Sequence, residues 1–286
     1  MRLHRLLAAV RGPFNCVPSG SLAAACYAVR AVTDPAIPTN AGCFRPITLE
    51  LPRGSIVNPS EPAPVNARTA TIKRITGCIL GALKEVLPER VPADSSGELV
   101  VLAFGGRHAG GAPFVTGELI AGGSGAGVRS DGVDVIETDV TNCMNLPVEA
   151  MEMDSPIRIH RVALRQDSGG AGRQRGGLGV VKEYEILDGE VSFTYRGERH
   201  FYAPQGAQGG GDGAKAHAVI HRADGREEAI ASKLVTRLQR GDRVVIETAG
   251  GGGNGAPATR DAAALDLDLA DGKVSAARAA ADYGRV

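Results

Sequence analysis

Four clusters of glycine constrain the fold of this 286-residue chain more than any other sequence feature. The clusters occupy residues 122–127, 169–179, 206–213 and 250–255, and the chain contains 39 glycines, about twice the usual share of roughly 7%. With 16 prolines, the two residue types make up about 19% of the chain, below the ~25–30% typical of low-complexity sequences. Because 43% of the residues are hydrophobic and 22% are charged, the composition excludes a disordered, collagen-like or coiled-coil chain.

The charge balance argues against two classes of partner. The chain has 32 basic and 32 acidic residues, so its formal net charge is zero. A nucleic-acid-binding protein would carry a basic excess, and a protein that binds membrane surfaces would carry a polybasic run. We therefore expect neither a nucleic acid nor a membrane as a partner.

The cysteines and the N-terminal residues favour a cytoplasmic location. The cysteine count is five, an odd number, and no pair has C-x-x-C spacing, which favours reduced thiols over a disulfide framework or a zinc ribbon. The longest apolar run, residues 22–29, is much shorter than the ~20 residues of a membrane span. Arg11 ends the first apolar stretch too early for a signal peptide.

Hydrophobic periodicity predicts an α+β protein in three parts. Residues 1–92 are expected to form a mixed α/β segment, the remnant of a larger domain. Residues 93–260 are expected to form a β-rich region with glycine-rich loops, and residues 261–286 a tail with a short helix.

Individual elements follow from local patterns. Apolar steps of three and four residues predict one helix capped by Ser19 or Ser21 and ending before Asp34, and a second over 72–86. Strands are predicted at 47–51, 99–104, 114–121, 133–140, 157–164 and 244–247, and the short helix at 274–283. The dipeptides Asp188-Gly189 and Asp224-Gly225 predict two β-hairpins, because type I′ turns favour Asp-Gly.

The glycine clusters do not match the known nucleotide-binding loops. None ends in the Gly-Lys-Ser/Thr of a P-loop, and none opens a predicted amphipathic helix as a Rossmann fingerprint would. Each cluster by itself is expected to be a turn rather than a site. The second cluster is the exception, because Arg173 and Arg175 lie among its glycines. Their guanidinium groups could bind a carboxylate or phosphate, or could face solvent or brace a neighbouring carboxylate, and the sequence leaves both interpretations open.

Two polar groups are candidate sites for chemistry. Asn142, Asn145 and Glu149 follow a predicted strand, where amides and a carboxylate can orient a polar substrate or an attacking water. The alternative is that the asparagines bond to their own turn backbone. Asn66 and Arg68 precede the second helix. They too could orient a substrate or could bond the local backbone, and Asn66 is favoured as the N-cap of the helix.

Signals for a metal or a nucleophile are weak. None of the six histidines lies in H-E-x-x-H or H-x-x-x-H spacing on a predicted helix, and we predict no metal ligands. His217 and His221 lie four apart on a predicted strand, about 13 Å from each other, so we expect surface residues. Cys43 and Cys143 are expected to be structural thiols, since no sequence feature supplies a base.

Several of these segments, taken in order, resemble the hydantoinase B/oxoprolinase family. The matching residues are 33–38 with 42–46, 58–59, 66–68 leading to 74–75, 122–126, 131–132, 141–142 with Asn145 and 147–149, 168–173 with 175–179, and 250–253. The likeness runs from about Asn15 to Pro257.

The resemblance covers only the C-terminal part of the longer family members. Their N-terminal part carries two segments rich in metal-ligand residue types, and neither occurs here, so the resemblance implies a truncated or split B-type subunit. Asn254 stands where the family usually has an aromatic residue, and Ala256 stands where it usually has Asp.

The resemblance implies an ATP-dependent hydrolase of cyclic amides, such as 5-oxoproline or hydantoins. An A-type partner binds ATP and phosphorylates a carbonyl oxygen, and the B-type part then acts on the activated intermediate. ATP and a divalent metal are implied for the complete complex, with the missing N-terminal B-type half as a second partner and no cofactor on this chain. For this step we select Asn142, Asn145 and Glu149 as catalytic residues, and Arg173, Arg175, Asn66 and Arg68 as substrate- or anion-binding residues.

The sequence also fits two other functions. Related family members imply a subunit of an ATP-dependent ketone carboxylase. The abundance of glycine and the lost metal-type segments also fit a non-catalytic scaffold or remnant fragment.

Overall fold

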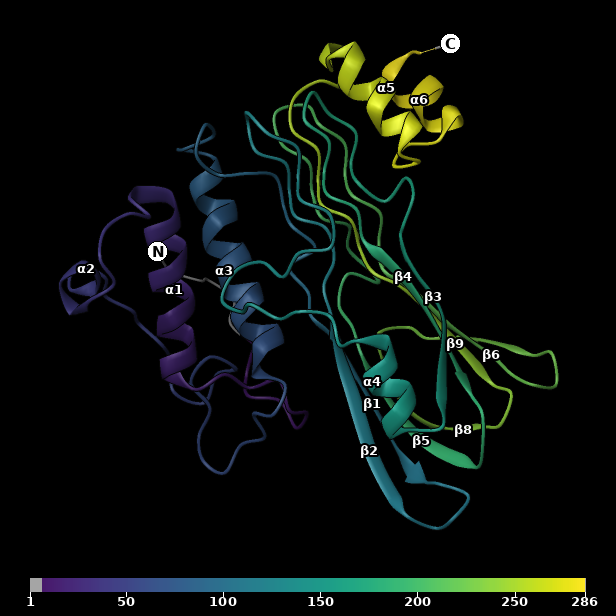
Figure 1. The fold of residues 1–286 in the computed structure, drawn as a ribbon. Coiled ribbons are helices and arrows are strands. Elements are labelled where there is room, and N and C mark those ends of the chain that lie inside the picture. The colour runs from purple at the N-terminus through teal and green to yellow at the C-terminus, as the bar shows by residue number, and fades with distance from the viewer. Residues whose placement is uncertain (1–6, 286) are drawn as a thin grey trace. The chain divides into compact units, whose positions relative to one another are not determined.

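The computed structural model describes residues 7–285, and the chain divides into two compact units. The first unit comprises the residues up to Val91 together with Asp139–Thr141. The second unit comprises Pro92–Thr138 and the chain from Asn142 onward, so it includes both the strands and the C-terminal helices. The α+β class predicted from the sequence is confirmed (Figure 1).

The first unit is built on two helices, and both were predicted. Helix α1 spans Pro18–Thr33 and packs against α3, Arg68–Lys84, while the short α2 spans Ala41–Phe44. The buried face of α1 consists mainly of alanine, so the two helices can approach closely. Pro18 begins α1 because its fixed φ suits the first helical turn, whereas the serine caps are wrong: no side chain caps this helix.

Two local predictions in the first unit are also wrong. Residues 47–51 form no strand, because no neighbouring strand is there to accept their hydrogen bonds. Asn66 is not the N-cap of α3; Ala67 holds that position without a side-chain hydrogen bond. The alternation of Ile47 to Leu51 therefore reflects partial burial of a loop and not pairing.

The second unit contains two antiparallel sheets. Their strands are β1 Val100–Arg107, β2 Pro113–Ile120, β3 Ile157–Leu164, β4 Val180–Ile186, β5 Glu190–Arg196, β6 His217–His221, β7 Glu227–Ala229, β8 Lys233–Gln239 and β9 Arg243–Glu247. One sheet has the order β2-β1-β5-β8 and the other the order β3-β4-β9-β6-β7. Predicted strands at 99–104, 114–121, 157–164 and 244–247 match β1, β2, β3 and β9.

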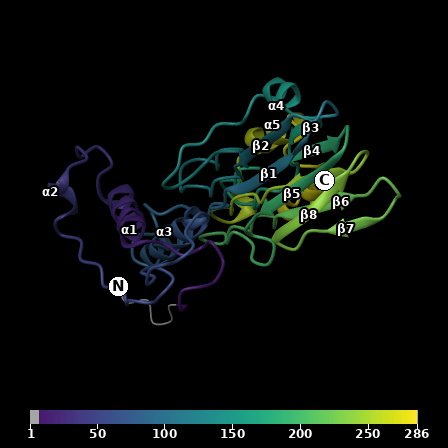
Figure 2. The same cartoon turned by 90° about the horizontal axis from the view of Figure 1, so that it is seen from below.

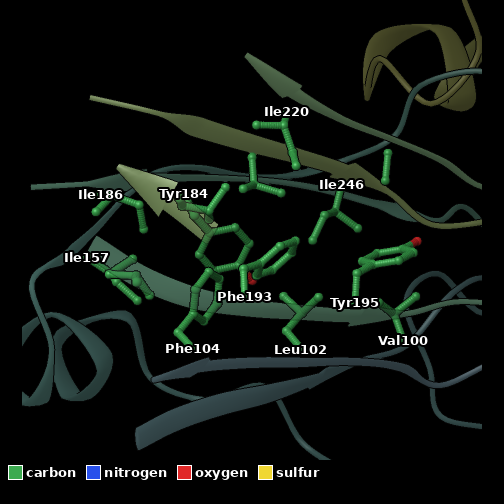
Figure 3. Packing of buried hydrophobic residues seen from close by; sticks show 14 of the residues in the cluster. Val100, Leu102, Phe104, Ile157, Tyr184, Ile186, Phe193, Tyr195, Ile220 and Ile246 are labelled. Atoms are coloured by element: carbon green, nitrogen blue, oxygen red, sulfur yellow. The ribbon is translucent and has the colours of Figure 1, made fainter. Parts of the chain in front are cut away.

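The inner faces of the two sheets share one apolar core. Figure 3 shows Phe104, Tyr184 and Phe193 at its centre, with branched aliphatic side chains around them. The ring of Phe104 lies 5.0 Å from that of Phe193 and 5.6 Å from that of Tyr184, centre to centre. Such aromatic pairs add to the stability that burial itself supplies.

One ion pair is buried between the two sheets. The Lys182 ammonium on β4 bonds the Glu118 carboxylate on β2, and the Tyr184 hydroxyl donates to the same carboxylate at 2.6 Å. Both charged side chains are almost fully buried, at 2% and 1% exposure. Burial, together with the charge of Glu118, raises the pKa of Tyr184 well above its ordinary value. The phenol therefore stays a hydrogen-bond donor.

The two Asp-Gly dipeptides behave differently. Asp224-Gly225 joins the antiparallel strands β6 and β7, so the second hairpin is confirmed, although only Gly225 has a positive φ, at 88°. The first hairpin is wrong, because β4 and β5 belong to different sheets and Asp188-Gly189 connects the sheets instead. The strand predicted at 133–140 is also absent; this segment is irregular apart from one bridge between Gly122 and Ile136.

The glycine clusters form a bundle of extended segments beside the sandwich (Figure 1). Gly250–Gly253 run through it, and their four N–H groups donate in turn to the carbonyls of Ala214, Gly177, Asp94 and Gly211. Residues three apart thus return to the same neighbouring segment, which is the period of a polyproline II helix. Apart from a turn at Gln208 and Gly209, the turn prediction for the clusters is wrong.

Only glycine fits the contacts between these segments. A Cβ atom on Gly251 would lie 1.8 Å from the carbonyl oxygen of Ser124, and one on Gly123 would lie 1.9 Å from that of Gly177. Both distances are far inside van der Waals contact. The glycine abundance that marks the sequence is therefore a packing requirement.

Three short α-helices and the 3₁₀ helix η1, Pro257–Thr259, complete the described part of the second unit. Helix α4, Val148–Asp154, precedes β3 and contacts β2 and β3 (Figure 2). Helices α5, Ala262–Ala270, and α6, Ala276–Tyr283, lie near the far end of the glycine bundle (Figure 1). The predicted C-terminal helix corresponds to α6, whereas α5 was not predicted. Within residues 7–285, no helix is both long and apolar enough to span a bilayer.

Candidate functional site

The polar group at 142–149 lies on a solvent-exposed segment of the second unit. Asn142 and Asn145 belong to the irregular segment before α4, and Glu149 lies in the first turn of α4. All three side chains are exposed, and within residues 7–285 none makes a hydrogen bond. The asparagines therefore do not bond to their own turn backbone, and all three groups can reach a bound molecule.

The segment carrying these residues is anchored on one side. Met151 of α4 is buried, and the Ser155 hydroxyl donates to its carbonyl at 2.7 Å. The backbone N–H of Ile159 on β3 donates to the Glu152 carboxylate at 2.8 Å. These contacts fix α4 against the sandwich and so hold the backbone that carries Glu149.

The two arginines of the second glycine cluster have different surroundings. Arg173 is exposed, and its Nη2 donates to the carbonyl of Val128 at 3.0 Å. Arg175 is only 3% exposed, and its guanidinium bonds Asp134 and Asp268, each at 3.2 Å. For Arg175 the geometry is that of bracing carboxylates, because its Nε donates to Asp268 and its Nη1 donates to Asp134.

Arg175 belongs to a larger charge network that connects the glycine bundle to α5. Arg260 bonds Asp131 at 2.7 Å and Asp268 at 2.6 Å, and Lys273 bonds Asp134 at 3.3 Å. Burial alone would raise the pKa of Asp131, but its hydrogen bond to Arg260 and the charge of that residue outweigh burial and lower it. The sequence does not predict this network, because its members lie up to about 142 residues apart, from Asp131 to Lys273.

Asn66 and Arg68 belong to the first unit. Both are exposed, and Arg68 is the first residue of α3. Their proposed role in binding a substrate or an anion stays a prediction.

Two features that would hold a metal ion or a phosphate group are not formed within residues 7–285. Among residues 7–285, no group of three or more His, Cys, Asp or Glu side chains is arranged to hold a metal ion. The glycine-cluster N–H groups that a phosphate cradle would need, such as those of Gly170, Gly176 and Gly211, donate to backbone carbonyls. We therefore assign no catalytic step on this chain to a metal ion or to ATP.

A half-buried histidine, His200, belongs to the loop that leads from β5 to the third glycine cluster. His200 Nε2 lies 2.8 Å from the Tyr195 hydroxyl. Burial, together with the charges of Lys233 and His217, lowers the pKa of His200 to about 4. The imidazole is thus neutral at pH 7 and accepts the Tyr195 hydrogen bond.

This histidine makes a testable contribution to acid stability. Its folded pKa of about 4 lies below the unfolded value of about 6.5, so its contribution is complete above pH 6.5 and is lost as the pH falls toward 4. We expect His200→Gln, which keeps an acceptor but does not titrate, to flatten the pH dependence of stability in this window. Urea unfolding between pH 4 and 7 measures how the free energy of unfolding depends on pH. His108→Gln is the control, because His108 lies in the loop between β1 and β2 and forms no ion pair within residues 7–285. Equal slopes for H200Q and the wild type would contradict the assignment.

The geometry defines an α+β protein in which an antiparallel β-sandwich is extended by a hydrogen-bonded bundle of glycine segments. The sequence profile of the family described as hydantoinase B/oxoprolinase matches residues 7–257. The chain therefore belongs to the hydantoinase B/oxoprolinase family, as its sequence motifs predicted.

Relatives with descriptive names agree with this membership. The chain is 34% identical to the 5-oxoprolinase of Dictyostelium discoideum, over 86% of this chain and 19% of that protein. It is 33% identical to a protein of a Pseudomonas species described as the B-type subunit of a D-/L-hydantoinase, over 86% of this chain and 42% of that one. An uncharacterized protein of Methanocaldococcus jannaschii is 39% identical over 98% of this chain and 48% of its own length.

A solved structure shares the fold. The crystal structure of the ATP-dependent caprolactamase from Pseudomonas jessenii superposes with a TM-score of 0.83 at 27% identity, over 98% of this chain and 50% of that one. The chain thus spans about half, or less, of the length of the relatives it matches.

Proposed function

We propose that this chain is the C-terminal part of the B-type subunit of an ATP-dependent hydrolase of cyclic amides. The observation that carries the proposal is the likeness, over nearly the whole chain, to a caprolactamase and to a 5-oxoprolinase, whose names denote action on cyclic amides. An A-type partner would supply ATP and activate the ring carbonyl. The rest of the B-type architecture would complete the site, and the complex would be cytoplasmic.

Amide chemistry explains why a partner is needed. Resonance makes the carbonyl carbon of a lactam a poor electrophile, and phosphorylation of the oxygen makes it reactive. After that step, the B-type part has to position the intermediate and a water molecule. The glycine bundle does not itself supply reactive groups, because its N–H groups bond within the bundle.

The exposed polar group at 142–149 is the best candidate for this positioning. In our proposal the Glu149 carboxylate accepts a proton from a water that adds to the activated carbon, the ring C–N bond breaks as its nitrogen is protonated, and a second water releases phosphate from the resulting acyl phosphate. The amides of Asn142 and Asn145 hydrogen-bond the intermediate. Arg173, which retains guanidinium donors at the surface, would bind an anionic group of the intermediate. Arg175 would act as a positioning residue, since its guanidinium braces Asp134 and Asp268.

The role of Glu149 has a direct test in the assembled complex. Glu149→Gln keeps the size of the side chain and removes the base, so we expect kcat for the cyclic amide to fall about 100-fold, within the usual range for general-base loss. Since Glu149 is exposed and makes no hydrogen bond, the free energy of unfolding should change by less than about 0.5 kcal/mol. Asp154→Asn, at an exposed position of the same helix, is the control and should leave kcat unchanged. Equal kcat values for E149Q and the wild type would remove Glu149 from the mechanism.

Reconstitution tests the function as a whole. The chain is combined with an A-type subunit and the N-terminal B-type part, and ATP hydrolysis is measured with 5-oxoproline, hydantoin or caprolactam. We expect ring opening and coupled ATP hydrolysis only when this chain is present. Unchanged turnover without the chain would contradict the proposal. Ketone consumption that requires bicarbonate would instead identify a carboxylase subunit, and no stable complex with an A-type subunit would favour a remnant.

A further inference from the structure

The first unit contains a cavity that the proposed reaction does not use. It has a volume of about 670 Å³ and lies between α1, α2 and the segment that joins them. Figure 1 draws this part of the chain in purple. Small-molecule sites in proteins usually measure about 300–1,000 Å³ and have mostly apolar walls with a few polar groups. This cavity has both properties.

The walls come mainly from a second apolar face of α1. Leu22, Cys26 and Arg30 follow one another at four-residue steps, so they line up along the helix, and Phe44 contributes from α2. Leu22 is 44% exposed although it is a large apolar residue. The opposite face of α1 is buried in the unit, so this helix has apolar side chains on both faces. A helix face that met only water would be expected to carry charged residues.

Arg30 is the one wall residue with a permanent charge among the cavity-lining residues of the described chain. Its Nη2 donates to the carbonyls of Pro35 and Ile37, at 2.9 and 2.6 Å. Its Nε is buried and has no hydrogen-bond partner. Across residues 7–285, no carboxylate lies within ion-pair distance of this guanidinium. A partly buried guanidinium beside apolar walls normally has an anionic partner.

We propose that this cavity binds a small carboxylate with an apolar body, whose carboxylate pairs with the Arg30 guanidinium. A guanidinium forms charge-assisted hydrogen bonds to carboxylates, and the apolar body would cover Leu22 and Phe44. A strongly hydrated inorganic anion would leave those apolar walls uncovered. Tyr27 also lines the cavity; burial and the charge of Asp139 raise its pKa, so its phenol stays neutral and can donate a further hydrogen bond.

The test uses the full chain and two eight-carbon ligands, octanoate with a carboxylate and 1-octanol with a neutral hydroxyl. Calorimetry or displacement of a fluorescent fatty acid measures their dissociation constants. We expect saturable binding of octanoate with one site per chain. Arg30→Gln should weaken octanoate at least 10-fold and change the affinity for 1-octanol less than 2-fold. Since 1-octanol binding requires an intact cavity, it also reports that the variant is folded.

Two further variants separate this site from general effects. Arg90→Gln removes a guanidinium that bonds the carbonyls of Val32 and Thr33 at the end of α1 but does not line the cavity, so both affinities should stay as in the wild type. Ala31→Phe fills the cavity and should abolish binding of both ligands. No saturable octanoate binding, or equal octanoate affinities for R30Q and the wild type, would overturn the proposal. The test is independent of the proposed hydrolase reaction, because it requires neither ATP nor a partner.

Discussion

Replacing Gly251 by alanine should destabilise the second unit by at least about 4 kcal/mol, a large part of the ~5–15 kcal/mol that stabilises a typical domain. The added Cβ would lie 1.8 Å from the Ser124 carbonyl oxygen and 2.2 Å from its carbon. Backbone atoms cannot move aside as a flexible side chain can, so the bundle must separate locally. Urea unfolding followed by circular dichroism measures the decrease in the free energy of unfolding. At 37 °C we expect most of the variant protein to be insoluble or unfolded.

Gly110→Ala is the matched control for that substitution. Gly110 lies in the loop between β1 and β2, and a Cβ there would meet no atom within 4 Å. Its stability should therefore stay within about 0.5 kcal/mol of the wild type. If G251A were as stable as G110A, the close-packed bundle could not be the structure of the glycine clusters.

Lys182→Met should cost about 3–5 kcal/mol, since it leaves the Glu118 carboxylate buried between the sheets without its cation. The Tyr184 hydroxyl would remain as a donor to that carboxylate, but it carries no charge. Adding Glu118→Gln should restore most of the loss, because a neutral amide oxygen can still accept from Tyr184. Denaturant unfolding of both single variants and the double variant measures the coupling between the two residues.

An exposed ion pair of the same sandwich provides the comparison. Arg237 and Glu190 pair on the outer surface, with their side chains 70% and 44% exposed. Arg237→Met should cost no more than about 1 kcal/mol, because water solvates the remaining carboxylate. Equal losses in K182M and R237M would show that burial of Glu118 adds no penalty.

Elements with a clear period were predictable from the sequence. The three- and four-residue apolar steps in residues 72–86 predict α3, and the alternating residues 157–164 predict β3. In both elements the spacing of apolar residues determines which face is buried. Helix α5 escaped prediction: Leu265, Leu267 and Leu269 alternate as in a strand, and the one helical signal was Asp261, whose side chain caps the N–H of Ala264.

Pairing of strands was less predictable than their existence. Asp188-Gly189 looks like the turn of a hairpin, yet β4 pairs with β3 and β9, while β5 pairs with β1 and β8. A dipeptide determines how the backbone turns, but long-range packing determines which sheet each strand joins. For the same reason the sequence indicated glycine-rich loops but not that they pack on one another.

The candidate site shows the same limit. Asn142, Asn145 and Glu149 are close in sequence, and their exposure agrees with the accessibility that a site requires, although their catalytic role stays a prediction. For Arg175, the sequence left anion binding and carboxylate bracing equally open, because Asp134 and Asp268 reach it only through the fold. The sequence gives no signal for Arg30, since an arginine in an amphipathic helix looks like an ordinary surface residue.

The glycine bundle also limits how this chain can change over generations. Every glycine codon begins with GG, and any third nucleotide still encodes glycine. A change at either of the first two positions therefore introduces a side chain or a stop codon, and only third-position changes are silent. At positions such as Gly123 and Gly251, where no side chain fits, nearly all such changes should be purged by selection. Genes of this kind should therefore accumulate silent differences in the bundle codons while surface loops, such as the one carrying Gly110, diverge freely.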